Sequence, residues 1–348
     1  MSTNLQPNNL YDNKYEFVEK LGSGTFGTVL KYLDKTLDRH VAVKVMNSDV
    51  GFTEENFLKE GKRTADLGKH PNIVAVNSYD VLNVWGDERN QCLFLEYCPE
   101  TLHKMLQDKK RLPFDEVVKI ALQLTDALVF AHQIEHDKVA VVHRDIKPNN
   151  ILFDKLGFLK LCDFGIAKDL KEHTISGGGA GTYPYAPYEQ LISDLEIDPK
   201  SDIYTVAFVL YESVSGKRPF RIKEKTKEEI LLGMQRIENK FPSFAKNLNV
   251  EPWFEKILMD CLRVNPDQRP TAQELKEKLE AGLSKAQKPE KPASKSELNL
   301  DYAEAYYNRG ISYNEVGDFE KAIEAYNKAI ELDPKYQSYK RALEDINK

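Results

Sequence analysis

The hydrophobic pattern of this 348-residue chain changes once, close to Pro99, and that change limits the folds open to it. Before it, short runs rich in β-branched residues alternate with glycine turns around one amphipathic stretch at 53–67, which predicts a small sheet carrying one helix. After it, apolar residues recur at three- and four-residue spacing, which predicts helices. We therefore expect two unlike lobes, a small β-rich lobe over 15–98 and a larger α-helical lobe over 99–283.

The remaining segments differ in composition from these lobes. Residues 1–14 are polar and predict an N-terminal tail, without the charged and then apolar layout of a signal peptide. Residues 284–300 are rich in Lys, Ser and Pro, which is typical of a solvated linker. A last unit follows over 301–348.

Composition and charge exclude several classes of protein. Hydrophobic residues make up 41% of the chain and charged residues 30%, which is enough apolar material for sizeable cores and excludes wholesale disorder. Lys and Arg number 49 against 55 Asp and Glu, a net charge of −6, so we expect no nucleic-acid partner. No window approaches the 18 consecutive apolar residues of a membrane span, and we expect a cytoplasmic protein. The cysteines form no Cys-x-x-Cys pair and predict reduced, mostly buried thiols: Cys92, Cys98, Cys162 and Cys261.

A glycine-rich segment, Leu21 to Val29, lies between two strand-like runs. Its glycines allow the backbone to turn tightly and to bring N–H groups against phosphate oxygens. The same spacing opens dinucleotide-binding folds, but those require a helix directly afterwards, and here a hairpin pattern follows. The context therefore argues against a dinucleotide site.

Lys44 stands inside the apolar strand pattern Val41-Ala42-Val43-Lys44. An unpaired ammonium group is expensive to bury, so this lysine requires anions around it. Glu60, in the helical stretch at 53–67, is one candidate partner, although a glutamate on a helix is more often simply solvated.

The most specific motif is Val142-His143-Arg144-Asp145-Ile146-Lys147-Pro148-Asn149-Asn150, followed thirteen residues later by Asp163-Phe164-Gly165. In this order after the glycine segment and Lys44, it matches the protein-kinase signature set. Over roughly residues 15–283 the chain thus resembles a Hanks-type, eukaryotic-like Ser/Thr protein kinase. The resemblance implies an α+β bilobal kinase fold.

The resemblance also implies a role for each matched residue in phosphoryl transfer, which requires positioning and charge neutralisation. Lys44 is expected to hold the α- and β-phosphates of ATP and to be oriented by Glu60. Asp145 is expected to accept the proton of the substrate hydroxyl. Lys147 is expected beside the transferring phosphoryl group, and Thr182 is expected to help hold Asp145 and Lys147.

The same resemblance implies the binding sites for ATP and its metal ion. Asn150 and Asp163 offer hard oxygen ligands for Mg²⁺, with Mn²⁺ as an alternative ion. The nucleotide site is expected to comprise the glycine segment, an apolar slot, a gatekeeper and the hinge backbone, in chain order Leu21, Gly22, Ser23, Gly24, Thr25, Phe26, Gly27, Val29, Ala42, Leu95 (the gatekeeper), Glu96, Cys98 and Leu152.

The segment after Asp163 departs from the family pattern at one place. Pro187-Tyr188 replaces the usual Ala-Pro before Glu189, which puts the local backbone shape in doubt. Glu189 and Arg269 resemble a buried structural ion pair, and Asp202 resembles the carboxylate that holds the backbone of the His143-Arg144 loop. Thr174 or Ser176 can present a phosphate to Arg144 or can be ordinary loop hydroxyls, and the sequence leaves this open.

The C-terminal unit resembles a single tetratricopeptide repeat followed by one more helix. Small and aromatic residues occupy the spacing of that repeat from Ala303 onward: Tyr306, Gly310, Tyr313, Ala322, Tyr326, Ala329 and Pro334. One repeat cannot cover its own apolar face, because stacking against neighbours supplies most of the stability. Docking on the kinase, self-association and capture of a partner protein all remain open, as does a merely stabilising hairpin.

Three functions are compatible with these motifs. The first is an ATP- and Mg²⁺-dependent Ser/Thr kinase that acts on proteins, phosphorylates its own activation loop and uses the repeat for protein interaction. The second is a pseudokinase or scaffold that acts through its repeat, and the intact Lys44, Asp145, Asn150 and Asp163 argue against it. The third is a small-molecule phosphotransferase, which the full segment from Asp163 to Glu189 disfavours.

Overall fold

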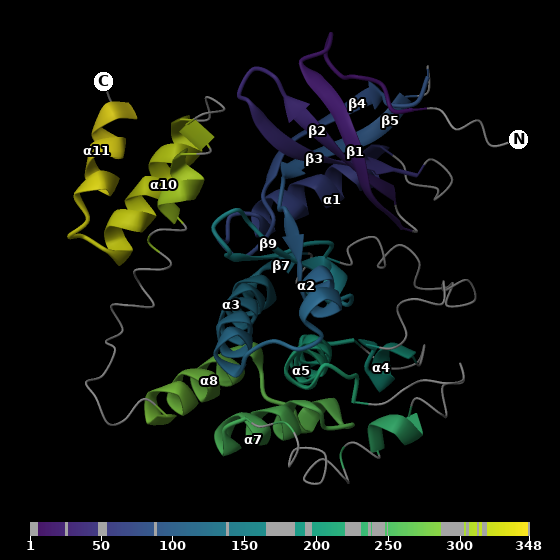
Figure 1. Cartoon of the computed structure of the whole chain (residues 1–348), viewed down its shortest axis with the longest axis vertical. Helices are drawn as coiled ribbons and strands as arrows, with labels where there is room; N and C mark the ends of the chain where they lie inside the picture. Colours follow the sequence, from purple (N-terminus) through teal and green to yellow (C-terminus); the bar gives the residue numbers. More distant parts are fainter. Residues whose placement is uncertain are drawn as a thin grey trace, which may run out of the picture.

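We analysed a computed structural model of the whole chain (Figure 1). It describes residues 6–24, 27–47, 54–86, 89–136, 139–164, 185–191, 197–219, 231–235, 238, 248, 250–286, 303, 306–311, 313–314 and 319–346. Among these residues no helix combines the length and the apolar character needed to cross a membrane.

The small lobe is a five-stranded antiparallel sheet with the order β1-β2-β3-β5-β4. Inward-facing residues such as Leu30, Tyr32 and Val43 form its core, as the alternating pattern predicts. The helix α1 packs against β4. The bounds are β1 (Tyr15–Gly24), β2 (Gly27–Asp34), β3 (Arg39–Met46), α1 (Glu54–Leu67), β4 (Val76–Asn83) and β5 (Arg89–Glu96).

Residues just before β1 are built into this lobe. The backbone N–H of Asn8 donates to Val84 O at 2.7 Å, and Tyr32 Oη donates to Asn8 O at 3.0 Å. Leu10 is buried in the core of the sheet. The segment expected as a tail therefore covers one end of the β4–β5 hairpin.

The large lobe is mainly helical and is built around α5 (Lys200–Ser215), which is apolar on nearly all sides and buried along most of its length. Gly216 ends this helix with φ of 70°, and a Cβ there would lie 2.6 Å from Lys110 O, so only glycine fits. Around it lie α2 (Leu102–Lys109), α3 (Phe114–Gln133), α4 (Tyr188–Leu191), α7 (Pro252–Cys261), η6 (Pro266–Gln268) and α8 (Ala272–Ala286).

Short strands lie where the two lobes meet (Figure 1). A three-stranded sheet has the order β10-β9-β6, and an isolated parallel bridge pairs Ile73 with Leu161. The bounds are β6 (Glu100–Thr101), β7 (Glu135–His136), β8 (Val139–Ala140), η2 (Pro148–Asn150), β9 (Ile151–Phe153) and β10 (Leu159–Leu161). The expected fold of a β-rich and an α-helical lobe is confirmed.

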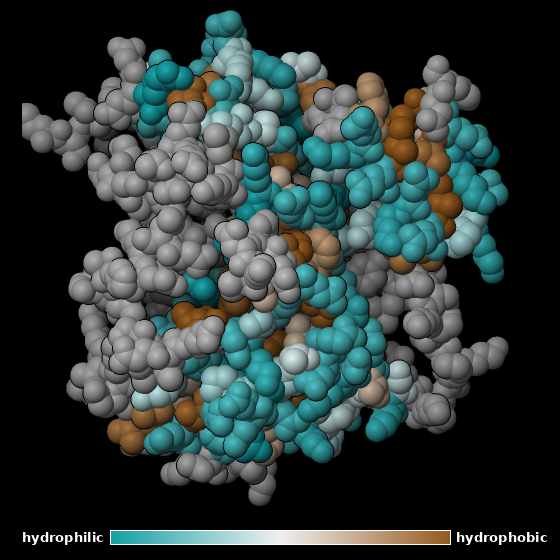
Figure 2. All heavy atoms as spheres, turned by 180° about the vertical axis from the view of Figure 1, so that it is seen from behind, coloured by the Kyte–Doolittle hydropathy of each residue, from teal (hydrophilic) through white to brown (hydrophobic). Residues whose placement is uncertain are grey.

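The C-terminal unit consists of a first helix through 306–311, α10 (Phe319–Leu332) and α11 (Gln337–Ile346). Small residues allow the helices to approach: a Cβ on Gly310 would collide with the ring of Tyr326 at 2.4 Å. Tyr326 is buried there with Ala322 and Ala325. Seen from behind, this unit lies beside the small lobe (Figure 2).

Candidate active site

Asp202 on α5 binds the backbone of the loop that carries Asp145. Asp202 is almost fully buried, and its carboxylate accepts the backbone N–H groups of His143 at 2.8 Å and of Arg144 at 2.9 Å. His132 Nε2 lies 2.9 Å from the same carboxylate. Burial alone would raise the pKa of Asp202, but the hydrogen bond with His132 and the neighbouring histidines lower it overall. Asp202 therefore remains a charged anchor, as its motif predicts.

The ring of His143 joins the two acidic segments of the site. Its Nδ1 accepts the backbone N–H of Asp145 at 3.2 Å, and its Nε2 lies 2.9 Å from Cys162 O, one residue before Asp163. Because burial lowers the pKa of His143, the ring is neutral, so Nε2 carries the proton and donates it to Cys162 O. One buried side chain thus fixes Asp145 relative to Asp163.

Two polar side chains of the same short loop, Lys147 and Asn150, meet at Asp145. Lys147 Nζ lies 2.8 Å from Asp145 Oδ2. Asn150 Nδ2 donates to the same oxygen at 3.1 Å and to the backbone carbonyl of Asp145 at 2.8 Å. The sequence places these residues within six positions, and η2 brings Asn150 back toward Asp145. Thr182, expected beside them, lies outside the described residues.

Lys44 pairs with Asp163 across the lobes. The two charged groups lie 2.8 Å apart, and their side chains are 16% and 43% exposed. The positive charge of Lys44 lowers the pKa of Asp163, so the carboxylate is ionised. Asp163 has φ of 58°, in the left-handed region that non-glycine residues adopt infrequently. Glu60 lies on α1, and its side chain is outside the described part of the helix.

Three of the four residues of the expected adenine slot lie on neighbouring strands of the small lobe, and the fourth lies on β9. Val29 on β2 pairs with Lys44 on β3, and Ala42 on β3 pairs with Leu95 on β5. Leu152 lies on β9 and is half-buried. The backbone N–H of Glu96 donates to Ala75 O at 3.1 Å, which holds the end of β5 in place. Cys98 is half-buried, and burial raises the pKa of its thiol well above the ordinary value.

The glycine segment forms the turn between β1 and β2. Leu21, Gly22, Ser23 and Gly24 are exposed at the end of β1. A Cβ on Gly27 would lie 2.3 Å from Val45 O, which is too close for any other residue. Thr25 and Phe26 lie outside the described residues.

Sequence reasoning missed a buried lysine beside the hinge. Lys160 on β10 is 8% exposed, and its Nζ lies 3.0 Å from the carboxylate of Glu96. That carboxylate also accepts the backbone N–H of Ala75 at 2.7 Å. The sequence contains a signal for this residue: a lysine between two apolar residues in Leu159-Lys160-Leu161. A lysine in an apolar strand pattern is also what identified Lys44 as a candidate residue.

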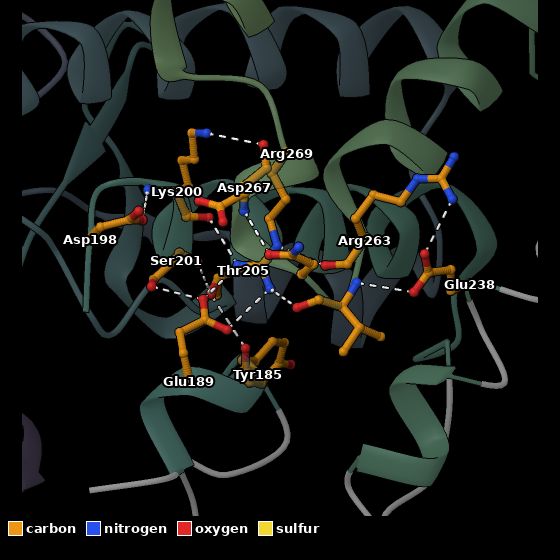
Figure 3. A network of polar contacts seen from close by, with 12 residues as sticks. Tyr185, Glu189, Asp198, Lys200, Ser201, Thr205, Glu238, Arg263, Asp267 and Arg269 are labelled. Atoms are coloured by element: carbon orange, nitrogen blue, oxygen red, sulfur yellow. Dashed lines mark hydrogen bonds and ion pairs between the residues drawn. The ribbon is translucent and has the colours of Figure 1, made fainter. Parts of the chain in front are cut away.

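The end of the activation segment is anchored by a buried ion pair (Figure 3). Arg269 contacts Glu189 through two hydrogen bonds of 2.5 and 3.1 Å, and Ser201 Oγ donates to the same carboxylate at 2.8 Å. Arg269 also donates to the backbone carbonyls of Arg263 at 2.7 Å and Val264 at 2.9 Å. The expected structural pair is present, and the change to Pro187-Tyr188 does not displace Glu189 from it.

Two hydrogen bonds and one ring contact tie this segment to the loop that carries Asp145, to α5 and to Arg218 after it. Gln190 Nε2 donates to Arg144 O at 2.6 Å. Tyr185 Oη donates to Glu212 at 2.6 Å, and Arg218 packs over the Tyr185 ring at 4.9 Å. Thr174 and Ser176 lie outside the described residues.

Comparison with known proteins agrees with this geometry. A protein kinase domain matches residues 15–279, and a tetratricopeptide repeat matches 303–336. A probable serine/threonine-protein kinase of Clostridium acetobutylicum is 30% identical over 320 residues, which cover 87% of this chain and 46% of the relative. The serine/threonine-protein kinase PknA of Mycobacterium tuberculosis is 36% identical over 213 residues, 60% of this chain and 48% of PknA. The chain belongs to the protein kinase family and spans less than half the length of these relatives.

Protein kinases generally use ATP and a divalent metal ion, and the residues present fit both. The side-chain nitrogen of Asn150 donates hydrogen bonds to Asp145. The side-chain oxygen of Asn150 is the atom that can coordinate a cation. Asp163 is ionised and partly exposed. Two hard oxygen donors of this kind are typical of a Mg²⁺ site that is completed by phosphates and water.

Proposed function

We propose that the protein transfers the γ-phosphate of ATP to Ser and Thr hydroxyls of proteins, with Mg²⁺ as the preferred ion and Mn²⁺ as an alternative. The observation that carries the proposal is the bridge made by the neutral ring of His143. Its Nδ1 accepts the backbone N–H of Asp145 at 3.2 Å, and its Nε2 donates to the carbonyl of Cys162 at 2.9 Å. A general base and a metal ligand are thereby held in one fixed geometry, which phosphoryl transfer requires.

Lys44 and Asp163 together prepare the phosphate site. In this structure each neutralises the other at 2.8 Å, and both keep an exposed side. Lys44 would exchange part of that contact for the α- and β-phosphates, while Asp163 and Asn150 would hold the metal ion. A bound Mg²⁺ supplies charge neutralisation along the phosphate chain.

Asp145 would accept the proton of the attacking hydroxyl. Its carboxylate receives Lys147 at 2.8 Å and Asn150 at 3.1 Å through Oδ2, which fixes its orientation. Lys147 is 25% exposed in its side chain, so its ammonium group can also reach a phosphoryl group. Thr182 and Glu60 are proposed to support Asp145 and Lys44, as the family resemblance implies.

The adenine would lie between Val29 and Ala42 above and Leu152 below, next to Leu95. The carbonyl of Glu96 and the backbone of Cys98 would bind its edge. The glycine segment from Leu21 to Gly27 would cover the phosphates with backbone N–H groups.

Protein substrates and partners complete the proposal. We propose that the enzyme also phosphorylates its own activation loop, at Thr174 or Ser176, and that the repeat mediates protein interaction. The net charge of −6 disfavours a nucleic-acid partner. The free thiols of the four cysteines suit a reducing, cytoplasmic compartment.

A direct test is phosphate transfer to a generic protein substrate by the wild type and by Asp145→Asn. Loss of the general base should lower the turnover rate about 10² to 10⁴-fold while ATP affinity stays close to that of the wild type. The matched control is Asp108→Asn, the same change at an exposed position at the end of α2, which should retain full turnover. Equal turnover of Asp145→Asn and wild type would refute the assignment of the base. Binding of ATP without any transfer by the wild type would favour the scaffold.

A further inference from the structure

Lys31 on β2 lies on the face of the small-lobe sheet that carries the proposed adenine slot. Its neighbours Leu30 and Tyr32 are buried in the core on the other face, and the alternation of side chains along a strand puts Lys31 on the same face as Val29. Across the sheet Lys31 pairs in register with Ala42 on β3. Its side chain is 14% exposed, so this charged residue lies largely buried beside the slot.

The ammonium group of Lys31 makes two contacts. Its Nζ lies 3.0 Å from the carboxylate of Glu19, the residue opposite it on β1. The same Nζ lies 4.7 Å from the centre of the Tyr97 ring, within the range of a cation–π contact. Tyr97 lies between Glu96 and Cys98, the two hinge residues whose backbone is proposed to bind the adenine. One side chain thus joins β1 to the hinge.

A second side chain packs on the same hinge residue. The ring of His40 on β3 lies 5.5 Å from the ring of Tyr97, at an interplanar angle of 57°. Burial lowers the pKa of His40, and the positive charges of Lys31 and Lys155 lower it further, so this ring is neutral at pH 7. The Tyr97 ring is therefore held from two strands, by a cation on β2 and by a neutral aromatic ring on β3.

The strand that Lys31 contacts is irregular where it approaches the glycine segment. The register of β1 against β2 shifts between Phe17 and Glu19, and again between Lys20 and Gly22. A register shift of this kind bends a strand and increases its twist. Glu19 lies between the two shifts, so its ion pair with Lys31 fixes β1 just before the glycine segment begins.

We propose that Lys31 is a positioning residue for the nucleotide, which holds the glycine-rich hairpin of β1 and β2 over the hinge through its contacts with Glu19 and Tyr97. The hairpin is the part of the site proposed to cover the phosphates, and the hinge is the part proposed to bind the adenine. Because binding must order both parts relative to one another, a clamp already in place between them lowers the conformational entropy lost on binding. This inference rests on the proposed function and adds to it a residue that acts through the hairpin and the hinge.

The chain offers a matched control for this residue. Lys35, directly after β2, pairs with Glu16 of β1 at 2.7 Å, and the two side chains are 44% and 49% exposed. This ion pair joins the same two strands at the end of the hairpin that is remote from the glycine segment. Lys35→Met therefore removes an ion pair between β1 and β2 and leaves the contact with Tyr97 intact.

The experiment measures the dissociation constant of a non-hydrolysable ATP analogue with Mg²⁺, by calorimetry on the full chain. Lys31→Met should weaken binding about three- to tenfold, because the ion pair and the cation–π contact are both lost. Lys31→Arg keeps both contacts and should bind nearly as well as the wild type, as should Lys35→Met. Adenosine lacks the phosphates that the hairpin covers, so its affinity should change much less in Lys31→Met. In turnover assays of Lys31→Met, KM for ATP should rise more than kcat falls.

Equal affinity of the wild type and Lys31→Met for the analogue would overturn the proposal. A similar loss in Lys35→Met would also overturn it, because any ion pair of the hairpin would then have the same effect. An equal loss for adenosine would contradict it as well, since Lys31 would then act on the adenine slot alone.

A double variant tests the contact between the two residues. Lys31→Met should weaken binding of the analogue less in a Tyr97→Leu background than in the wild type, and equal weakening would show that the two residues act independently. A wild type that does not bind the analogue would refute the proposed function and this inference with it. A wild type that binds it, with Lys31→Met binding equally well, would refute the inference alone.

Discussion

Two ion pairs lie in and beside the candidate active site, and they differ in how much protein surrounds them. Arg269 and Glu189 have side chains that are 0% and 3% exposed, and both are surrounded by further protein hydrogen bonds. Lys44 and Asp163 are 16% and 43% exposed. Because neither solvent nor a ligand reaches the buried pair, its two residues have no alternative partners. The exposed pair can exchange partners, as the proposed binding of phosphates and a metal ion requires.

The difference has an energetic basis. A buried charge that loses its partner cannot recover its hydration, so breaking one side of such a pair is costly. A charge near the surface regains water and counterions, so breaking the pair costs little. Stability and catalysis should therefore separate between the two pairs.

The largest expected loss of stability follows from Arg269→Met. It leaves Glu189 buried without its cation and removes the donor to the carbonyls of Arg263 and Val264, so the free energy of unfolding should fall by about 3 to 5 kcal/mol. Urea unfolding measures it. The control is Arg263→Met, which breaks a pair with Glu238 whose side chains are 38% and 23% exposed and should cost about 1 kcal/mol or less. Similar losses in both variants would mean that burial does not separate these pairs.

An intermediate loss of stability is expected on substitution of Asp126, because the exposed fraction of its side chain, 14%, lies between those of the two pairs above. Burial alone would raise its pKa, but the hydrogen bonds with His70 and Lys276 lower it to about 2, against an ordinary value of 3.8. A carboxyl group with a lowered folded-state pKa stabilises the protein above its unfolded-state pKa, and this contribution disappears as the pH falls toward the folded-state value. It amounts to about 2 kcal/mol at pH 7, and about half should be lost by pH 3.

Asp126→Asn should therefore be less stable than the wild type at pH 7, and the gap should narrow as the pH is lowered from about 5 toward 3. Urea unfolding at several pH values measures both chains. Asp115→Asn, on the exposed start of the same helix, should show no such gap. A gap that stays constant with pH would show that Asp126 acts by packing and not by its charge.

Much of this architecture could be predicted because its signals are local. The change of periodicity near Pro99 predicts the two lobes, and Asp145, Lys147 and Asn150 meet because they share one short loop. The contact between Lys44 and Asp163 joins residues 119 positions apart, and only the family resemblance placed both in one site. Their direct pairing was not expected, since Glu60 was the proposed partner of Lys44.

Other contacts had weaker signals in the sequence. Glu96 and Lys160 are 64 positions apart, and a lone lysine in a three-residue strand does not specify its partner. The segment around Asn8 and Leu10 is polar enough to predict a tail, yet backbone hydrogen bonds and one buried leucine attach it to the sheet. Main-chain bonding leaves no compositional signal, which is why the sequence could not predict this attachment.

The smallest loss of stability is expected for Lys44→Met, although its loss of activity should be severe. The exposed side of Asp163 can be hydrated once the lysine is gone, so the free energy of unfolding should change by about 1 kcal/mol or less. Phosphate transfer should fall about 10² to 10³-fold, because a fixed positive charge on the phosphates is lost. Urea unfolding and turnover on the same preparation measure both quantities, with Lys119→Met, exposed on α3, as the control. If Lys44→Met destabilised the protein as much as Arg269→Met, the partly exposed pair would be structural after all, and exposure would not mark the contact that exchanges partners during catalysis.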